Sequence, residues 1–172
     1  MHDNSEERFP IVDEEGVTVG SATRGECHGG TMWLHPVVHL HVLNSRGELY
    51  LQRRPMWKDI QPGRWDTAVG GHIDYGEEVE DALRREAREE LGITDFRATR
   101  LLRYVFESSR ERELVNVFCT TYDGEVMPSD ELDGGRFWTM DEIRAAMGHG
   151  VLTPNFEQEF ERIAPLLPCG RE

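Results

Sequence analysis

The sequence predicts an α/β fold, because short strand-like segments alternate along the chain with two or three helical patterns. Apolar runs rich in β-branched and aromatic residues predict strands at 9–12, 17–23, 35–43, 48–53, 97–107, 113–122 and 137–139. Helical periodicity predicts helices at 77–91, 140–147 and 155–166. A chain of 172 residues fits one domain, so we expect residues 1–172 to form it, with residues 1–8 as a flexible polar terminus.

The predicted strands 35–43 and 48–53 are joined by a turn at 44–47, which predicts a hairpin. His35, His39 and His41 occupy alternate positions of the first strand and therefore share one of its faces. For His39 and His41 we expect a polar, partly solvated face of the sheet. Trp65 follows this hairpin, and we expect it to anchor the core, although a tryptophan in such a loop can also stack on a ligand.

The helix predicted at 77–91 carries three carboxylates on one side. Glu86, Glu89 and Glu90 stand at i, i+3 and i+4, so their like charges repel one another unless a cation lies between them. Hard oxygen ligands favour Mg²⁺ or Mn²⁺. An apolar stripe that would dock the helix on a core repeats every four residues, at Val79, Leu83, Ala87 and Leu91.

Glycines border this helix on both sides. Gly92 follows the last apolar residue as a typical helix-ending glycine, and acidic residues at 77–78 suit the first turn. Upstream, Gly70 and Gly71 end a short apolar run, which we interpret as a loop whose backbone can approach a ligand closely. The unit therefore reads as loop, helix, loop.

The segment Gly71 to Ile93, GHIDYGEEVEDALRREAREELGI, resembles the Nudix box, G-x5-E-x7-R-E-U-x-E-E-x-G-U, at every fixed position. The resemblance implies an α/β/α sandwich with a mixed sheet. It also implies hydrolysis of a diphosphate linkage in a nucleoside diphosphate derivative or related diphosphate, by attack of a metal-activated water.

By the same resemblance, Glu86, Glu89 and Glu90 would bind Mg²⁺ or Mn²⁺ and one carboxylate would act as the base; the sequence does not decide which. Arg85 would hold the glutamates in place through a salt bridge. The structural positions of the motif are Gly71, which would ease the turn into the loop, Glu77, which would brace it, and Gly92.

A second resemblance extends from Ile11 to about Phe118 and is to the Nudix branch that contains type 1 isopentenyl-diphosphate isomerase. It rests on VDEEGVTVGSATRGECH, the Leu34-His35 pair, NSRGELYLQRRP and PGRWDTAVGGHIDYGE. Such isomerases hold a divalent metal with three histidines and two glutamates. The residues at the matching positions are His28, His35, His72, Glu111 and Glu113, the two glutamates matching less securely. Arg54 and Lys58 would grip the substrate diphosphate, next to Gly70 and Gly71.

One departure from this branch concerns the reaction itself. The isomerases use a cysteine two residues before the histidine that matches His72, and this chain has Gly70 there. A glycine transfers no proton, and Cys27, in a different segment, does not match that role. Diphosphate hydrolysis is therefore the preferred function, with isomerisation and a non-catalytic nucleotide-binding module as the alternatives.

Two assignments stay open on sequence grounds. His28, His35 and His72 either bind a second metal ion or support the first site through hydrogen bonds. Glu131, ahead of the predicted strand 137–139, is either an additional base or an ordinary loop residue.

The composition limits the partners. A net charge of −14 argues against nucleic acid or an anionic membrane as the main partner, so we expect a small diphosphate drawn to a local basic patch at Arg53, Arg54 and Lys58. The absence of a long apolar run or leader, and three scattered cysteines, predict a cytoplasmic protein with reduced thiols. A homodimer is common among similar proteins, but the sequence does not decide the oligomeric state.

Overall fold

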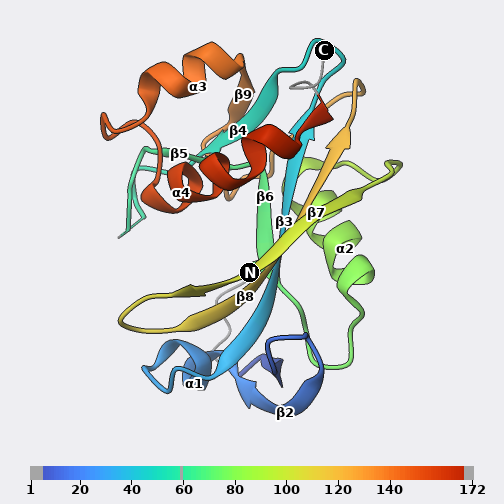
Figure 1. Ribbon diagram of the computed structural model, residues 1–172, viewed down its shortest axis with the longest axis vertical. Helices are drawn as coiled ribbons and strands as arrows, with labels where there is room; N and C mark the ends of the chain where they lie inside the picture. The colour runs from blue at the N-terminus through green and yellow to red at the C-terminus, as the bar shows by residue number, and fades with distance from the viewer. Residues whose placement is uncertain (1–5, 59, 169–172) are drawn as a thin grey trace.

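The computed structural model describes residues 6–58 and 60–168, which form a mixed β-sheet lying between helices on its two faces (Figure 1). Seven strands build this sheet, and two more form a separate hairpin. The arrangement confirms the predicted α/β/α sandwich. The strands are β1 (Arg8–Val12), β2 (Thr18–Thr23), β3 (Leu34–Leu43), β4 (Leu49–Arg53), β5 (Trp65–Thr67), β6 (Val69–His72), β7 (Thr99–Glu107), β8 (Arg112–Thr121) and β9 (Gly135–Trp138). The helices are α1 (Arg24–His28), α2 (Val79–Leu91), α3 (Met140–Ala146), α4 (Pro154–Ile163) and the 3-10 turn η1 (Ala164–Leu166).

Strand β3 is the centre of the sheet. It pairs in parallel with β8 along its whole length and antiparallel with β6, while β4 joins it only near Leu43. Strands β5 and β9 flank β4, and β7 is antiparallel to β8. Strand β6 therefore has a free side near the point where β3 and β4 diverge, and the candidate site forms there.

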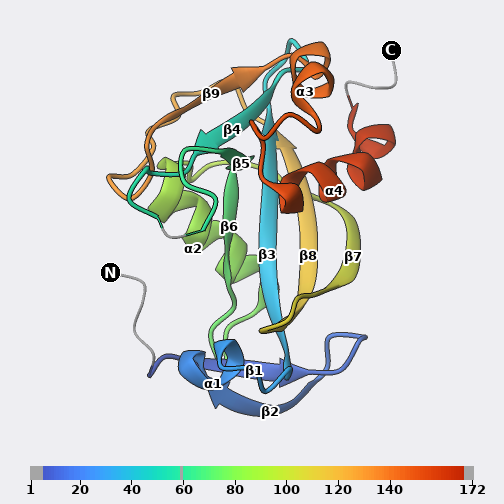
Figure 2. The same cartoon turned by 90° about the vertical axis from the view of Figure 1, so that its left-hand side faces the viewer.

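Two apolar cores lie on the two faces of the sheet, and Figure 2 shows the helices that cover them. On one face α2 buries Leu83, Ala87 and Leu91 against β3 and β6, as the four-residue repeat predicts. On the other face α4 buries Phe156 and Phe160. Each buried leucine or phenylalanine side chain stabilises the fold by about 1.5–3 kcal/mol. The paired cores fix α2 and α4 on opposite sides of the same strands.

The β1–β2 hairpin and α1 form one end of the molecule (Figure 2). Thr23 caps α1 and exchanges hydrogen bonds with Glu26 in a capping box, which starts this short helix immediately after β2. Cys27, on the buried side of this helix, packs with Phe9 and Ala22 and is fully buried. This packing holds His28, the last residue of α1, toward the end of β6.

Several boundaries differ from the sequence predictions. Helix α1 and strands β5 and β6 were not predicted, and α2 begins at Val79, so Glu77 lies in the loop before it. The expected flexible terminus is too long, because Arg8 opens β1 and Glu7 binds Arg24; residues 1–5 and Cys169 lie outside the described residues. Within the described part of the chain, no helix is long and apolar enough to cross a membrane.

Candidate active site

Helix α2 directs its acidic side toward β6. The helix ends at Gly92, whose φ of 68° is left-handed and whose N–H binds the Ala87 and Arg88 carbonyls, as expected for a helix-ending glycine. Gly71 of β6 faces the helix so closely that a Cβ atom there would overlap the carboxylate of Glu86. A glycine is thus required where strand and carboxylate meet.

Two of the three glutamates on this side are strongly desolvated. Burial raises the pKa of Glu90 well above its usual range, and the carboxyl group of Glu86 hydrogen-bonded to it adds to the shift. The pKa of Glu86 is also raised, again mainly by burial. The peptide N–H of Gly70 binds Glu90 from the strand side. The raised pKa values mean that these two crowded carboxyl groups hold protons more strongly than ordinary glutamates do.

Arg85 organises the cluster from its edge. Its Nε and Nη2 atoms donate to the two carboxylate oxygens of Glu77 at 2.9 Å each, and Nη1 donates to Glu86 at 3.0 Å. Nη2 also donates to the His72 carbonyl at 3.1 Å, which ties the helix to β6. Glu77 in turn accepts the Asp74 peptide N–H. Burial opposes ionisation of Glu77, but these hydrogen bonds outweigh it and lower its pKa. Arg85 thus ties Glu77, Glu86 and the end of β6 together.

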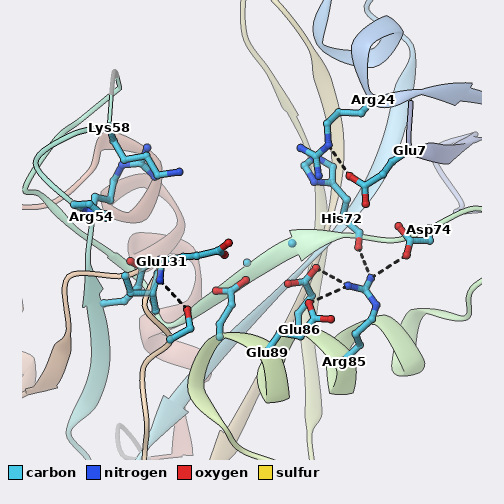
Figure 3. A pocket seen from close by; sticks show the side chains of 17 residues that line it. Glu7, Arg24, Arg54, Lys58, His72, Asp74, Arg85, Glu86, Glu89 and Glu131 are labelled. Carbon is cyan, nitrogen blue, oxygen red and sulfur yellow. Dashed lines mark hydrogen bonds and ion pairs between the residues drawn. The ribbon is translucent and has the colours of Figure 1, made fainter. Parts of the chain in front are cut away.

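A cavity of about 230 Å³ opens above the glutamates. Figure 3 shows Arg54 and Lys58 on one side of it and Arg24 on the other, with the Glu86 and Glu89 side chains rising from α2 between them. Cationic groups therefore face an anionic floor, which suits a phosphate ligand bridged to the floor by metal ions. Gly70, Gly71, Glu90 and Glu131 also line the cavity.

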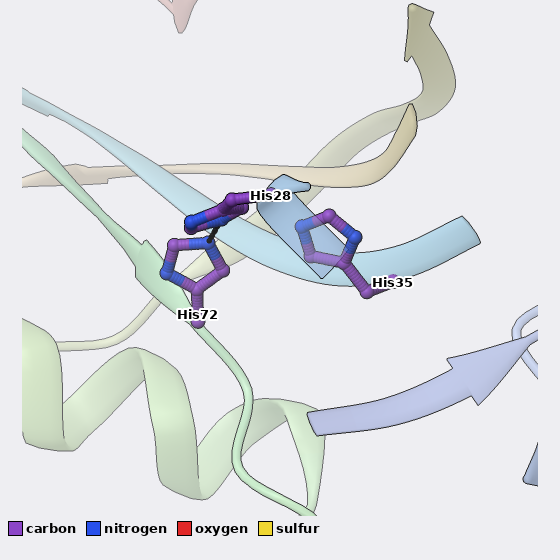
Figure 4. Close-up of side chains that lie close together, drawn as sticks. All are labelled: His28, His35 and His72. Carbon is purple, nitrogen blue, oxygen red and sulfur yellow. Dashed lines mark hydrogen bonds between the residues drawn. The ribbon is translucent and has the colours of Figure 1, made fainter. Parts of the chain in front are cut away.

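The three predicted histidines converge beside this cavity (Figure 4). The Nε2 atoms of His28 and His72 are 3.3 Å apart, and their ligand atoms and that of His35 all lie within 4.8 Å of one another. Glu111 lies 3.3 Å from His28, and His35, Glu111 and Glu113 form an overlapping group within the same limit. All five predicted residues are brought together by α1, β3, β6, β8 and the loop before β8 that carries Glu111.

The chemistry of this histidine–glutamate cluster, which comprises His28, His35, His72, Glu111 and Glu113, suits a divalent metal. His35 Nδ1 donates to the Trp33 carbonyl at 3.2 Å, so the lone pair is on Nε2, which is buried and makes no hydrogen bond to any described residue. Burial lowers the pKa of His35 to about 4, so the ring is neutral and able to bind a metal. Burial and the neighbouring Glu111 raise the pKa of Glu113 to about 7.

Other predicted positions behave differently. The expectation of a partly solvated face holds for His39, which is 22% exposed, but is wrong for His41, which α4 covers and which is fully buried; both rings bind Glu159. Arg53 binds Asp133 at 3.1 Å and lies outside the cavity. Trp65 packs against the core and crosses Trp138 edge to face, as expected.

Sequence reasoning missed Arg24 and Glu159. Arg24 pairs with Glu7 at 3.0 Å and lines the cavity opposite Arg54. Its position within the stretch that resembles the isomerases, four residues before His28, was the one signal for it. Glu159 is an acidic residue on the apolar side of α4, and only that position in the helical pattern marks it.

Residues 33–156 match the model of the NUDIX domain, and the chain belongs to the Nudix family. An isopentenyl-diphosphate Delta-isomerase of Mycolicibacterium vanbaalenii is 32% identical over 147 residues, which cover 81% of each protein. An uncharacterized Nudix hydrolase of Pseudomonas aeruginosa is 34% identical over 127 residues, covering 73% of this chain and 75% of its relative.

A crystal structure of a protein from Deinococcus radiodurans matches the fold with a TM-score of 0.77 and 27% identity, covering 91% of this chain and 98% of that one. The relatives therefore include both isomerases and hydrolases. The resemblance to the isomerase-like branch is confirmed.

Proposed function

We propose that this protein is a metal-dependent Nudix hydrolase that cleaves the diphosphate linkage of a nucleoside diphosphate derivative or a related organic diphosphate. The observation that carries the proposal is the carboxylate cluster of α2, fixed by Arg85 under a cavity with arginine and lysine on its walls. A binding module has no need to crowd two desolvated carboxylates at the base of its pocket.

The residues present fit a divalent cation. Glu86, Glu89 and Glu90 offer hard oxygen ligands, and the raised pKa values of Glu86 and Glu90 reflect crowded carboxylates whose negative charge a bound cation would offset. When bound there, Mg²⁺ or Mn²⁺ would neutralise phosphate oxygens and lower the pKa of a water molecule toward neutrality.

The side chains around the cation have separate tasks in this proposal. Arg54 and Lys58 hold the diphosphate oxygens from one wall of the cavity and Arg24 from the other. A carboxylate of the α2 cluster accepts the proton of the attacking water, and Glu131 on the cavity rim is the second candidate for this step.

The histidine–glutamate cluster is proposed as a second divalent-metal site. Its support is the convergence of five ligand side chains and the Nε2 atom of His35, which lies 3.6 Å from Glu111 and makes no hydrogen bond to any described residue. Imidazole-rich ligand sets favour transition metals such as Mn²⁺ over Mg²⁺.

Isopentenyl-diphosphate isomerisation is the second candidate function. The same histidine–glutamate cluster and the isomerase relatives favour it. Gly70 argues against it, since it supplies no proton donor, and Cys27 is fully buried below α1 and does not line the cavity.

A substrate screen distinguishes these functions. Nucleoside diphosphate derivatives and isopentenyl diphosphate are incubated with the protein and Mg²⁺ or Mn²⁺, and phosphate release and double-bond migration are scored separately. We expect phosphate release from the nucleoside diphosphate derivatives, whose products are treated with phosphatase, and no double-bond migration in isopentenyl diphosphate, which is assayed without phosphatase. Migration without release would establish the isomerase instead, and binding with neither reaction would establish a binding module.

A further inference from the structure

Glu159 of α4 is a buried carboxylate with three hydrogen-bond donors. Its side chain is 1% exposed, and it accepts hydrogen bonds from His39 Nδ1 at 2.8 Å, His41 Nε2 at 2.6 Å and the Tyr104 hydroxyl at 2.6 Å. Burial raises the pKa of Glu159, but the two imidazole rings outweigh it and keep the carboxylate ionised. His39 is thus held in one orientation by a fixed negative charge.

The other ring nitrogen of His39 is directed away from Glu159. His39 is 22% exposed, and its Nε2 and Cδ2 atoms lie 3.6 and 3.4 Å from the place that a Cβ atom on Gly70 would occupy. With Nδ1 bound to Glu159, Nε2 is the nitrogen on the Gly70 side of the ring, at the distance of ordinary van der Waals contact from that Cβ position. Burial lowers the pKa of His39, but Glu159 raises it to about 9, so Nε2 carries a proton at neutral pH.

His39 and Gly70 both line a second cavity of about 250 Å³, which we call the His39 chamber. The lining residues that the chamber shares with the cavity above the glutamates are Gln52, Arg54, Gly70, Gly71 and His72. Gly71 faces Glu86 of α2, whereas Gly70 faces His39, so the two cavities meet across the glycine pair at the free side of β6. A ligand whose phosphate lies over α2 can pass this pair, because neither residue has a side chain.

The walls of the chamber are polar. Besides His39 they include the amide groups of Gln52 and Asn155 and the carboxylate of Asp66. Among the described lining residues, Val37 has the one purely aliphatic side chain. The Oε1 atom of Gln52 is buried and has no hydrogen-bond partner among the described residues. A hydrocarbon chain would leave these groups unsatisfied, whereas a group with its own donors and acceptors would pair with them.

We propose that His39 is a substrate-binding residue whose Nε2–H donates to an oxygen of the polar group attached to the diphosphate, and that Glu159 is the positioning residue that holds it. The chamber selects substrates in which the diphosphate carries a hydroxyl-rich or amide-bearing group rather than an isoprenoid. The placement of the diphosphate over α2 rests on the proposed function.

Two substitutions of His39 separate its two hydrogen bonds. The side-chain amide of asparagine can replace Nδ1 toward Glu159 but does not reach the chamber, whereas that of glutamine can replace Nε2 but gives up Glu159. Binding is measured by calorimetry with Mg²⁺, using α,β-methylene ADP-ribose as the complete probe and methylenediphosphonate as the diphosphate alone. Neither probe is hydrolysed, so the result does not depend on whether the protein is a hydrolase.

We expect His39→Asn to weaken binding of the complete probe by about tenfold, the size of one lost hydrogen bond to a charged group, and His39→Gln to weaken it less. The affinity of the same variants for methylenediphosphonate should change by less than about twofold. Asn155→Ala, at an exposed position of α4, should also weaken only the complete probe, and it tests the chamber if the His39 variants fail to fold. Unchanged affinity for the complete probe, or an equal loss for both probes, would overturn the proposal.

Discussion

The carboxylate of Glu86 in α2 fills the place beside β6 that a side chain on Gly71 would take. The contact sets how near the strand lies to the acidic cluster. It also sets where the Glu86 oxygens lie relative to Glu90, because the two carboxyl groups are hydrogen-bonded.

Replacing Gly71 by alanine tests this contact. The added Cβ would push the Glu86 carboxylate aside, and because that group is the end of a flexible side chain, the fold should survive. A displacement of about 1 Å at a reacting centre can lower a rate by roughly 100-fold. We expect such a loss of phosphate release with little change in thermal unfolding. Gly20→Ala, whose Cβ would lie 4.0 Å from Ile11, is the matched control; equal activity in both variants would remove Gly71 from the account.

Arg85→Lys tests the clamp on the glutamate cluster, by which we mean the hydrogen bonds from Arg85 to Glu77 and Glu86. Lysine keeps the positive charge but cannot form the two-pronged pair with Glu77 and still reach Glu86 and the His72 carbonyl. Both partners are less than one quarter exposed, and we expect the free energy of unfolding to fall by about 2 kcal/mol in urea titrations. Arg46→Lys breaks an exposed pair with Glu48 and should cost less than about 0.5 kcal/mol. A similar small cost at both positions would mean that the clamp contributes no stability.

The His39–Glu159 pair predicts how stability depends on pH. Burial lowers the pKa of His39, but Glu159 raises it to about 9, above the unfolded value of about 6.5. The folded protein therefore keeps a proton that the unfolded chain releases, and the stability from this pair, complete below pH 6.5, is lost as the pH rises toward 9. In chelator-treated protein, the free energy of unfolding should fall from pH 7 to pH 9 more steeply than in Glu159→Gln. Parallel slopes would contradict the assigned pKa.

The histidine–glutamate cluster predicts a second class of metal site. Manganese binding is measured from the paramagnetic signal of the Mn²⁺ that stays free. We expect one site to be lost in His35→Asn, because the neutral Nε2 atom of His35 faces the other ligands. Glu89→Gln should leave that site in place, since Glu89 belongs to the other cluster. The same number of Mn²⁺ ions on wild type and His35→Asn would exclude the second site.

Local patterns in the sequence predicted the parts of the site that one element supplies. The spacing of Glu86, Glu89 and Glu90 and the glycine after α2 are properties of one helix, and the structure agrees with them. Strand β6 was missed because its glycine pair shows no alternation of side chains; pairing with β3, where Val38 lies opposite Gly71, makes it a strand. Partners distant in sequence were also missed.

Glu159 illustrates that second kind of error. It lies 120 residues from His39, and periodicity within either element says nothing about their contact. His39 and His41 were consequently predicted to form a partly solvated face, although α4 supplies a carboxylate that binds one nitrogen of each ring. The convergence of His28, His35 and His72 came from resemblance to a family and not from spacing, since three separate elements carry them.

The most direct test of the central claim is phosphate release by Glu90→Gln compared with wild type, on the best substrate from the screen with saturating Mg²⁺. Glutamine keeps the size of the side chain and removes the charge, so the fold should persist. The account predicts a loss of at least about 100-fold, the scale of a removed group that stabilises charge in a transition state. Phosphate release at the wild-type rate would contradict the assignment of the α2 glutamates as the hydrolytic centre.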